Sequence, residues 1–554
     1  MIKVKRLLFV SKSAQALVIA CLVVLAGCGT AEPELPNILL IVADDLGFSD
    51  LGCYGGEIET PQLDKMAENG IRLTHFYSTG RCCPSRASIL TGLYPHRAGL
   101  GHMIKDLGRP GYRGTVADDA VTIAQVLQPA GYRTFMSGKW HLGTDDPTRH
   151  GFEEFYGTLV SAQTFWDPDH FLRLPQGRKA RVYNENEFYS TDALTDHALD
   201  FLTEARKTPD QPWFLYLAHN APHFPLHAPM KNIAKYAQRY EAGWDDIRQR
   251  RYDKMRQLGI IPEETPLSPR SRYWDWGEEE TGTNPAWQDV SPDRQKDLVR
   301  RMAIYAAMVD IMDRNIGRVV TDLSDNNELE NTLIIFISDN GACAEWDPYG
   351  FDVKSSPFNI LHRDAEIDTM GSPGTYHSVG SGWANVSNTP WRLYKHYNHE
   401  GGISSPFIVQ WPDGLKRRGT IDHRPGHLID LMPTLLEVAG AKYPGAFHGQ
   451  NTAPLAGKSI LPLLQGDSVE ARTFYFEHEG NRAVTDGRWK LSALKGQDWE
   501  LYDLESDRTE LVNLTTRYPE VVARLDSAWS IWAENNFVTP LPEDLGAAYL
   551  KPVK

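Results

Sequence analysis

Two pairs of oxygen-bearing side chains follow apolar runs of the sequence. Asp44 and Asp45 come after the run at 37–43, and Asp339 and Asn340 end the run that starts at 332. Carboxylates that meet without a cation repel one another and raise each other's pKa values, and a bound cation removes that cost. Because all four side chains offer oxygen, we expect Ca²⁺, with Mg²⁺ less favoured, and not zinc. A single pair of this kind could equally be a helix cap or a turn.

Basic side chains occur at corresponding places. Taken alone, each is typical of a surface residue or a satisfied polar residue, but together, in a chain with a net charge of -15, they indicate a local anion site. An ester of a tetrahedral oxyanion, held between a divalent metal and such donors, is placed for attack at sulfur or phosphorus. The candidates are Arg86, Lys139, His141, His223 and Lys395, with His219 as a weaker one.

Two of the six cysteines of the chain are adjacent, in the stretch TGRCCPSRASILTG at 79–92. Pro84 is suited to the first position of a helix that ends at Gly92. Cys82 would then lie just before the helix N-terminus, where free amide groups and the helix dipole favour a negative charge. With Arg86 one turn further on, we expect a reactive thiol at Cys82. The alternative is that Cys82 and Cys83 are small buried hydrophobic residues.

The elements that must position these residues follow an alternating pattern. Helical patterns at 117–131, 191–207 and 293–323 lie between short runs that are apolar throughout, as expected for strands covered on both faces. This alternation predicts an α/β fold with a large, mainly parallel sheet sandwiched by helices. The carboxyl ends of parallel strands share one edge, where ligands bind. The predicted strands are 37–43, 132–137, 213–218, 332–338 and 406–411.

We expect a catalytic domain at 37–465 and a smaller C-terminal α+β domain of antiparallel strands and a helix at 466–554. Within the first domain, the pattern fades at about 229–292, which indicates an insert, and again at 342–390. Long inserts near strand ends often shape a pocket, although surface decoration is an equal alternative.

The N-terminus resembles a bacterial lipoprotein signal. Residues 1–27 contain a basic start and a short apolar run that is too short to span a bilayer, and Cys28 follows. The resemblance implies cleavage before Cys28, lipid on its sulfur, and a tether at 28–36. The protein would then be an exported lipoprotein, periplasmic or anchored to the outer membrane; an ordinary secretory signal is the alternative. No basic tract stands out, so we do not expect nucleic acid as a partner.

The motifs together resemble those of the type I sulfatases of the alkaline phosphatase superfamily, most closely the bacterial arylsulfatases, over about residues 36–554. Cys82, Pro84, Ser85 and Arg86, followed by the LTG at 90–92, match the family signature. Five further motifs agree in order and spacing: VADDLG (42–47), GKWHLG (138–143), APHFP (221–225), SDNG (338–341) and KHYNHEGG (395–402).

The resemblance implies that a maturation enzyme oxidises Cys82 to formylglycine, while Cys83 occupies a free position of the motif. One hydroxyl of the hydrated aldehyde would attack the sulfur of a sulfate ester and expel the alcohol or phenol. The second hydroxyl would then lose its proton and expel sulfate.

The resemblance also assigns roles to the other residues. Asp44, Asp45, Asp339 and Asn340 would bind calcium. Arg86 would hold the formylglycine hydrate, and His141 would help to deprotonate it. Lys139, His223 and Lys395 would bind the sulfate, and His223 or Lys395 would assist the leaving group. His219 is a further candidate for that task.

Two other functions are compatible with parts of this pattern. A phosphonate or phosphate ester hydrolase would use the same nucleophile, metal and fold. A catalytically silent, lipid-anchored binding protein could keep the scaffold, although it should have lost motif residues, and none is missing here. The substrate of a sulfatase could be a sulfated saccharide, a sulfated phenol or a small sulfated alcohol.

Overall fold

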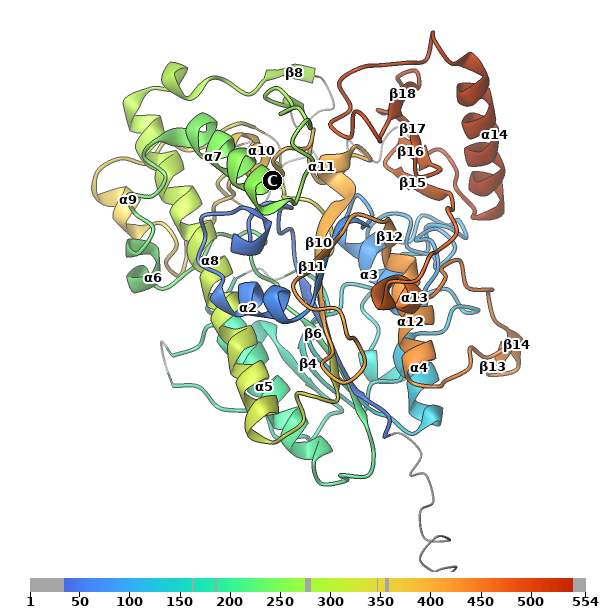
Figure 1. Ribbon diagram of the computed structural model, residues 1–554. Coiled ribbons are helices and arrows are strands. Elements are labelled where there is room, and N and C mark those ends of the chain that lie inside the picture. The colour runs from blue at the N-terminus through green and yellow to red at the C-terminus, as the bar shows by residue number, and fades with distance from the viewer. Residues whose placement is uncertain are drawn as a thin grey trace, which may run out of the picture.

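The computed structural model describes residues 34–161, 164–184, 187–274, 280–345, 347–353 and 358–541 (Figure 1). Its central element, within these residues, is a ten-stranded sheet in the order β11-β2-β10-β9-β1-β6-β3-β4-β5, with β12 also paired to β2. The strands are β1 (Asn37–Ala43), β2 (Ile71–Tyr77), β3 (Arg133–Lys139), β4 (Glu154–Thr158), β5 (Leu172–Leu174), β6 (Trp213–Ala218), β9 (Thr332–Ser338), β10 (Ser404–Gln410), β11 (Thr420–Asp422) and β12 (Gly426–His427).

The middle of the sheet is parallel. β1 pairs with β6 on one side and β9 on the other, so that Val42 faces both Ala218 and Ile337. β3 and β4 continue this direction. β10 runs antiparallel to β9 and β2, and β5 is antiparallel to β4. The predicted α/β class with a mainly parallel sheet is therefore confirmed.

Helices cover both faces of the sheet because the side chains of β1 alternate between two hydrophobic clusters. Leu39 and Ile41 pack with α2 (Pro61–Asn69), α5 (Ser190–Ala205) and α8 (Pro292–Asp325). The neighbouring residues of β1 pack with helices on the other face, which lies to the right in Figure 1. Those helices are α3 (Cys82–Thr91), α4 (Ile123–Leu127) and α12 (Leu431–Val438).

The helix predicted at 117–131 is wrong in extent. α4 begins only after Thr122, whose hydroxyl accepts from Gln125 N while the Gln125 side chain accepts from Thr122 N. This reciprocal cap fixes the start of the helix, and a 3₁₀ turn at Gln128–Ala130 ends it. The patterns at 191–207 and 293–323 correspond to α5 and α8.

The insert predicted at 229–292 contains regular structure: α6 (Met230–Ala234), α7 (Gly243–Leu258) and the paired strands β7 (Arg272–Trp274) and β8 (Glu280–Thr283). Shorter elements follow β9. They are α9 (Ala365–Thr369), α10 (Ser381–Ser387), α11 (Glu400–Ile403), β13 (Ala446–Phe447), β14 (Gln450–Asn451) and α13 (Leu461–Gln465).

The C-terminal part is a four-stranded antiparallel sheet covered by one helix, as predicted (Figure 1, upper right). Its elements are β15 (Phe474–His478), β16 (Asn481–Thr485), β17 (Trp489–Ala493), β18 (Glu500–Asp503) and α14 (Pro519–Asn535). The domain boundary at 465/466 stays a prediction.

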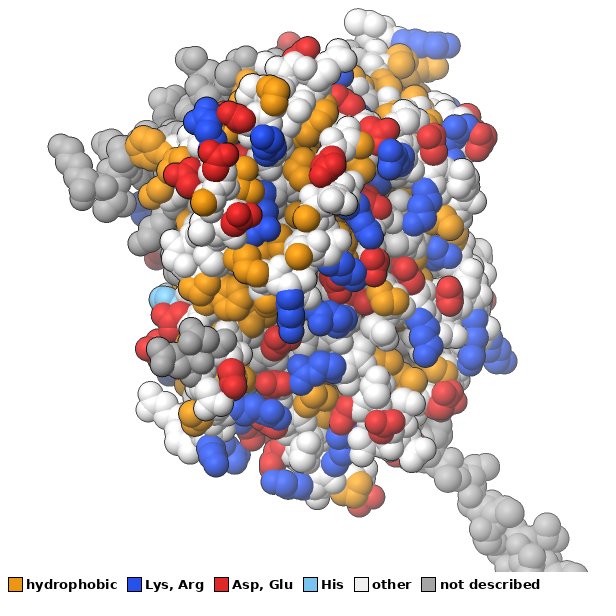
Figure 2. Space-filling model, turned by 90° about the vertical axis from the view of Figure 1, so that its left-hand side faces the viewer, with side chains coloured by type: hydrophobic (Ala, Val, Ile, Leu, Met, Phe, Trp, Pro, Cys, Tyr) orange, Lys and Arg blue, Asp and Glu red, His pale blue; other side chains and the backbone are white. Residues whose placement is uncertain are grey.

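The predicted signal, Cys28 and most of the tether lie outside the described residues. Within the described part of the chain, no helix is long and apolar enough to cross a membrane. On the face that includes α6 and α9, basic and acidic side chains are interspersed (Figure 2).

Candidate active site

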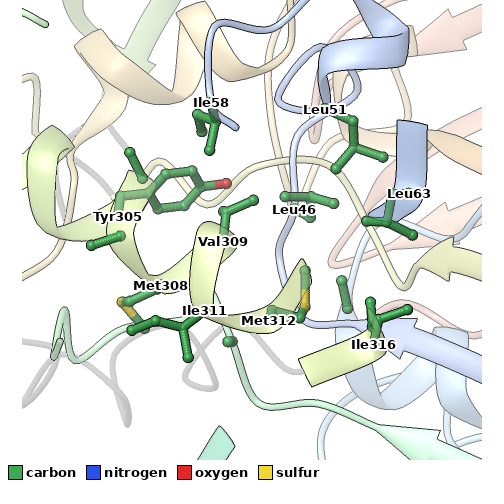
Figure 3. Packing of buried hydrophobic residues seen from close by; sticks show 14 of the residues in the cluster. Leu46, Leu51, Ile58, Leu63, Tyr305, Met308, Val309, Ile311, Met312 and Ile316 are labelled. Atoms are coloured by element: carbon green, nitrogen blue, oxygen red, sulfur yellow. The ribbon is translucent and has the colours of Figure 1, made fainter. Parts of the chain in front are cut away.

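The loop after β1 rests on the hydrophobic core. Leu46 and Leu51 share a buried cluster with Val309 of α8 (Figure 3). Tyr305, on the same helix, donates its hydroxyl hydrogen to Asp50 Oδ2 at 2.7 Å. A close-packed core has low compressibility, so packing against α8 holds in place the loop that carries the first acidic pair.

The four predicted acidic and amide residues meet at one edge of the sheet. Asp45, which has a left-handed backbone (φ 66°), donates its N–H to Asp339 Oδ1 at 3.1 Å. Asn340 Nδ2 donates to Asp45 Oδ1 at 2.7 Å. Asp44, Asp45, Asp339 and Asn340 are all at most 1% exposed. Strands that are about 300 positions apart in sequence therefore deliver one cluster of oxygen atoms.

This cluster fits a hard cation. Asp44 Oδ1 and Asn340 Oδ1 are buried and have no hydrogen-bond partner among the described residues. Burial, and then the charge of Asp44, raise the pKa of Asp339 well above its usual range. Buried oxygens that lack donors, beside a carboxylate whose pKa is raised, are what a bound divalent cation would satisfy, and an all-oxygen set suits calcium.

Arg86 joins the acidic cluster to the rest of the site. Its Nη2 lies 2.8 Å from Asp339 Oδ2 and 3.6 Å from Asp44 Oδ1. Its Nη1 donates to the carbonyl oxygen of Lys139 at 2.9 Å. Burial alone would lower the pKa of this guanidinium, but Asp339 and Asp44 raise it, so Arg86 is charged.

Lys139 and His141 come from the end of β3. Lys139 Nζ lies 2.6 Å from Asp44 Oδ2, and His141 Nδ1 lies 3.5 Å from Cys82 Sγ. Burial, with the charge of Lys139 in support, lowers the pKa of His141 to about 4. The imidazole is therefore neutral at pH 7 and can accept a proton from a group at position 82.

Helix α3 begins at Cys82, with Arg81 as its N-cap, and not at Pro84 as predicted. It ends at Gly92, which has a left-handed backbone (φ 67°). A hydrogen bond with Cys83 lowers the pKa of Cys82 well below its usual range against the effect of burial, with further support from the charge of Lys139. The thiol thus lies at the helix N-terminus and beside a neutral base, in the setting expected of a reactive cysteine.

Lys395 and His223 form a pair on the other side of Asp45. Lys395 Nζ lies 2.8 Å from Asp45 Oδ2 and 3.5 Å from His223 Nε2, and His223 Nε2 lies 3.4 Å from the same carboxylate oxygen. Burial would lower the pKa of Lys395, but Asp45 and other anionic neighbours raise it well above its usual range. The pair can therefore present a cation and an imidazole to one bound group.

His219 is not joined to these residues. It follows β6, is fully buried, and neither ring nitrogen has a hydrogen-bond partner among the described residues. Burial lowers its pKa to about 3, so the ring is neutral.

The sequence analysis missed two residues at the edge of the site, Glu345, which contacts Lys395, and Arg81, which contacts Glu345. Glu345 lies 3.7 Å from Lys395 Nζ and 3.7 Å from Arg81 Nη2, and it is 4% exposed. Arg81 could have been suspected because it is the neighbour of Cys82. Glu345 carries no motif signal, since only the fold brings it to the site.

Helices cover both faces of the sheet, and carboxylates, cations and a cysteine lie at its carboxyl edge. This arrangement is that of an α/β enzyme with a charged, buried site. Comparison with known proteins gives the family. The model of the sulfatase family matches residues 36–441, and that of the N-sulphoglucosamine sulphohydrolase C-terminal region matches residues 390–530. The chain belongs to the sulfatase family and is a sulfuric ester hydrolase.

Individual relatives agree with this assignment. An uncharacterized sulfatase of Schizosaccharomyces pombe is 34% identical, with 95% of this chain and 98% of the relative covered. An arylsulfatase of Klebsiella aerogenes is 33% identical, with 83% of this chain and 97% of the relative covered. The crystal structure of Ps i-CgsB in complex with k-i-k-neocarrahexaose aligns with a TM-score of 0.64 at 25% identity, covering 92% of this chain and 94% of that one.

Proposed function

We propose that the protein hydrolyses sulfate monoesters with a formylglycine derived from Cys82 and with bound Ca²⁺. The observation that carries this proposal is the position of Cys82, at a helix N-terminus and 3.5 Å from His141, beside a buried cluster of acidic and basic side chains. A hydrated aldehyde at position 82 would supply two hydroxyl groups, one to attack sulfur and one whose deprotonation releases sulfate.

The metal would be held by Asp44, Asp45, Asp339 and Asn340. Calcium at these oxygens would polarise the ester and offset the charge that develops on it. The two buried oxygens without donors support this assignment.

The chain's own residues divide the remaining tasks. Arg86 orients the group at position 82 by a fixed guanidinium. His141 Nδ1 accepts the proton from that group. Lys139 and Lys395 hold the sulfate oxygens by their charges, and the Lys395–His223 pair delivers a proton to the leaving oxygen.

For the substrate, we propose a sulfated phenol or a sulfated saccharide. Two similar proteins support this choice: the relative from Klebsiella aerogenes is an arylsulfatase, and the structural neighbour Ps i-CgsB was crystallised with the saccharide k-i-k-neocarrahexaose. We also propose that the protein is an exported lipoprotein anchored through Cys28, on the pattern of residues 1–28. Loss of the protein from the membrane fraction in a Cys28→Ala variant tests the anchor.

The test of the reaction uses protein produced together with a formylglycine-generating enzyme. Mass spectrometry of the peptide that contains residue 82 should show a mass lower than that of the unmodified peptide, by the difference in mass between cysteine and formylglycine. Purified protein with calcium should release sulfate from an aryl sulfate faster than phosphate from the matching aryl phosphate. An unmodified thiol with no sulfate release would refute the proposal, and faster phosphate release would favour the phosphoester hydrolase.

A further inference from the structure

Three aromatic rings from distant parts of the chain meet beside the site. We call Phe224, Phe351 and Tyr376 the aromatic wall. The rings of Phe224 and Phe351 are in edge-to-face contact, with centroids 5.0 Å apart, and the centroid of Tyr376 is 6.2 Å from each of the two. These separations are those of attractive aromatic pairs.

The wall borders the groups that would contact the ester. The ring of Phe224 lies 4.0 Å from the ring of His223, its neighbour in sequence. The ammonium group of Lys395 lies 5.9 Å from the centroid of Phe224. A group bonded to an oxygen held by His223 and Lys395 therefore comes within reach of the Phe224 ring.

One buried guanidinium group holds the backbone next to the residues of the aromatic wall. Arg301, on α8, donates from Nη1 to the carbonyl oxygens of Phe351 (3.3 Å) and Ser378 (3.0 Å). Its Nη2 donates to both oxygens of Asp352, at 3.0 and 2.9 Å. Asp352 also bonds His377 Nδ1. The residues adjacent to two of the three rings are thus tied together, which preorganises the wall.

The exposure of the rings shows which of them can contact a ligand. Phe351 is only 2% exposed, whereas Phe224 and Tyr376 are half-buried and keep accessible ring surface. Asp352 and Arg301, whose hydrogen bonds hold the backbone next to Phe351, are engaged with each other. Apart from the hydroxyl group of Tyr376, the wall offers ring surface, whereas a hydroxyl-rich sugar needs several well-placed polar groups in its site.

We propose that the aromatic wall binds the leaving group of the ester and gives the enzyme a preference for a flat aromatic leaving group over a sugar. Phe224 and Tyr376 are the residues that determine this specificity. The inference rests on the proposed function for the position of the ester, but the recognition of an aromatic ring by the wall does not need turnover.

The test measures binding by calorimetry, with calcium, in a Cys82→Ala background that cannot turn over. The ligands are naphthyl sulfate, methyl sulfate, glucose sulfate and free naphthol. Phe224→Leu and Tyr376→Leu remove a ring and keep apolar bulk, and Tyr376→Phe, which keeps the ring, is the matched control.

We expect each leucine variant to reduce the ratio of naphthyl sulfate affinity to methyl sulfate affinity by about three- to tenfold, the range for one aromatic pair. Tyr376→Phe should keep the ratio. Free naphthol should lose affinity by a similar factor. This measurement separates the two proposals. If no sulfate ester binds but naphthol binding still depends on both rings, the proposed function is refuted and the proposal that the wall binds an aromatic ring is supported. An unchanged ratio, or an equal loss for glucose sulfate, would overturn the inference.

Discussion

The ammonium group of Lys139 lies 2.6 Å from Asp44 Oδ2, although Lys139 ends β3 and Asp44 follows β1, with β6 between the two strands in the sheet. Burial would raise the pKa of Asp44, but Lys139, His223 and Arg86 hold it below its usual range. The carboxylate is therefore shared: one oxygen pairs with Lys139, and the other has no hydrogen-bond donor among the described residues. The anion site and the proposed metal site meet at this residue.

Replacing Lys139 should therefore affect both sites. We expect Lys139→Met to lower kcat/KM for an aryl sulfate by about 10²- to 10³-fold, the usual effect of losing one preorganised electrostatic contact. The exposed Lys207, paired with Glu204 on the surface, gives the matched control Lys207→Met, which should keep full activity. Equal activity of the two variants in steady-state kinetics would show that Lys139 does not contact the reacting ester.

Calcium should stabilise the folded protein. A ligand that binds only the native state at about 100 times its Kd adds about 2.7 kcal/mol to the free energy of unfolding. We expect the Tm of chelator-treated protein to rise on addition of calcium, and to rise little in Asp45→Ala. Magnesium is the control ion, with a smaller shift. A Tm that calcium does not change would exclude the oxygen cluster as a metal site.

Substitutions of the two adjacent cysteines, Cys82 and Cys83, should have very different effects on activity. Cys82→Ala should reduce kcat by at least about 10³-fold, since loss of a nucleophile removes most of the catalysis. Cys83→Ala deletes a buried sulfur and its hydrogen bond with the Cys82 thiol, a bond that a formylglycine at position 82 no longer needs. We therefore expect activity together with a modified residue 82 in the mass spectrum. If Cys83 carries the modification instead, the assignment of the nucleophile is wrong.

Continuously apolar runs made the centre of the fold predictable. The bounds of β1, β6 and β9 agree with the runs at 37–43, 213–218 and 332–338, because strands covered on both faces contain little besides apolar residues. β2 was missed because it contains Arg72 and Thr74. Their partners, the carbonyl of Cys53 and the ring of His423, lie elsewhere in the sequence, so only the folded chain satisfies them.

The same contrast applies to the site. The proximity of residues at strand ends, such as Asp44 and Asp339, could be predicted from the sequence because parallel strands share a carboxyl edge. Glu345, Phe351 and Tyr376 could not, since they come from irregular segments whose path depends on ion pairs such as Arg301 with Asp352. The local pattern carries no signal for such long-range pairing.

Because of His141, both the stability of the folded protein and its activity should fall at acid pH. The pKa of His141 falls from 6.5 in the unfolded chain to about 4. Between these two pH values the unfolded chain binds more protons at His141 than the folded protein does. The contribution of His141 to the free energy of unfolding is therefore present above pH 6.5 and is lost as the pH falls toward 4. His141→Asn should remove that contribution and lower kcat by about 10²- to 10⁴-fold. Unfolding curves and a pH–rate profile check both, and an unchanged profile would exclude His141 as the base.

A buried lysine should hold the C-terminal sheet to the catalytic part. Lys490 Nζ, on β17, lies 2.8 Å from Glu400 Oε1 of α11 and 2.9 Å from Glu510 Oε1, and all three side chains are fully buried. Lys490→Met would leave two buried carboxylates without this partner, so we expect a loss of about 3–5 kcal/mol in the free energy of unfolding.

The surface variant Lys207→Met, which breaks an exposed pair, should cost at most about 1 kcal/mol. Adding Glu510→Gln to Lys490→Met should recover part of the loss, because a neutral amide tolerates burial better than a carboxylate that has lost its ammonium partner. Glu400 is left unchanged because it keeps its ion pair with Arg508. Denaturant unfolding of the four proteins, wild type included, measures these differences. If Lys490→Met unfolds at the same midpoint as Lys207→Met, the buried triad does not stabilise the contact between the two parts of the chain.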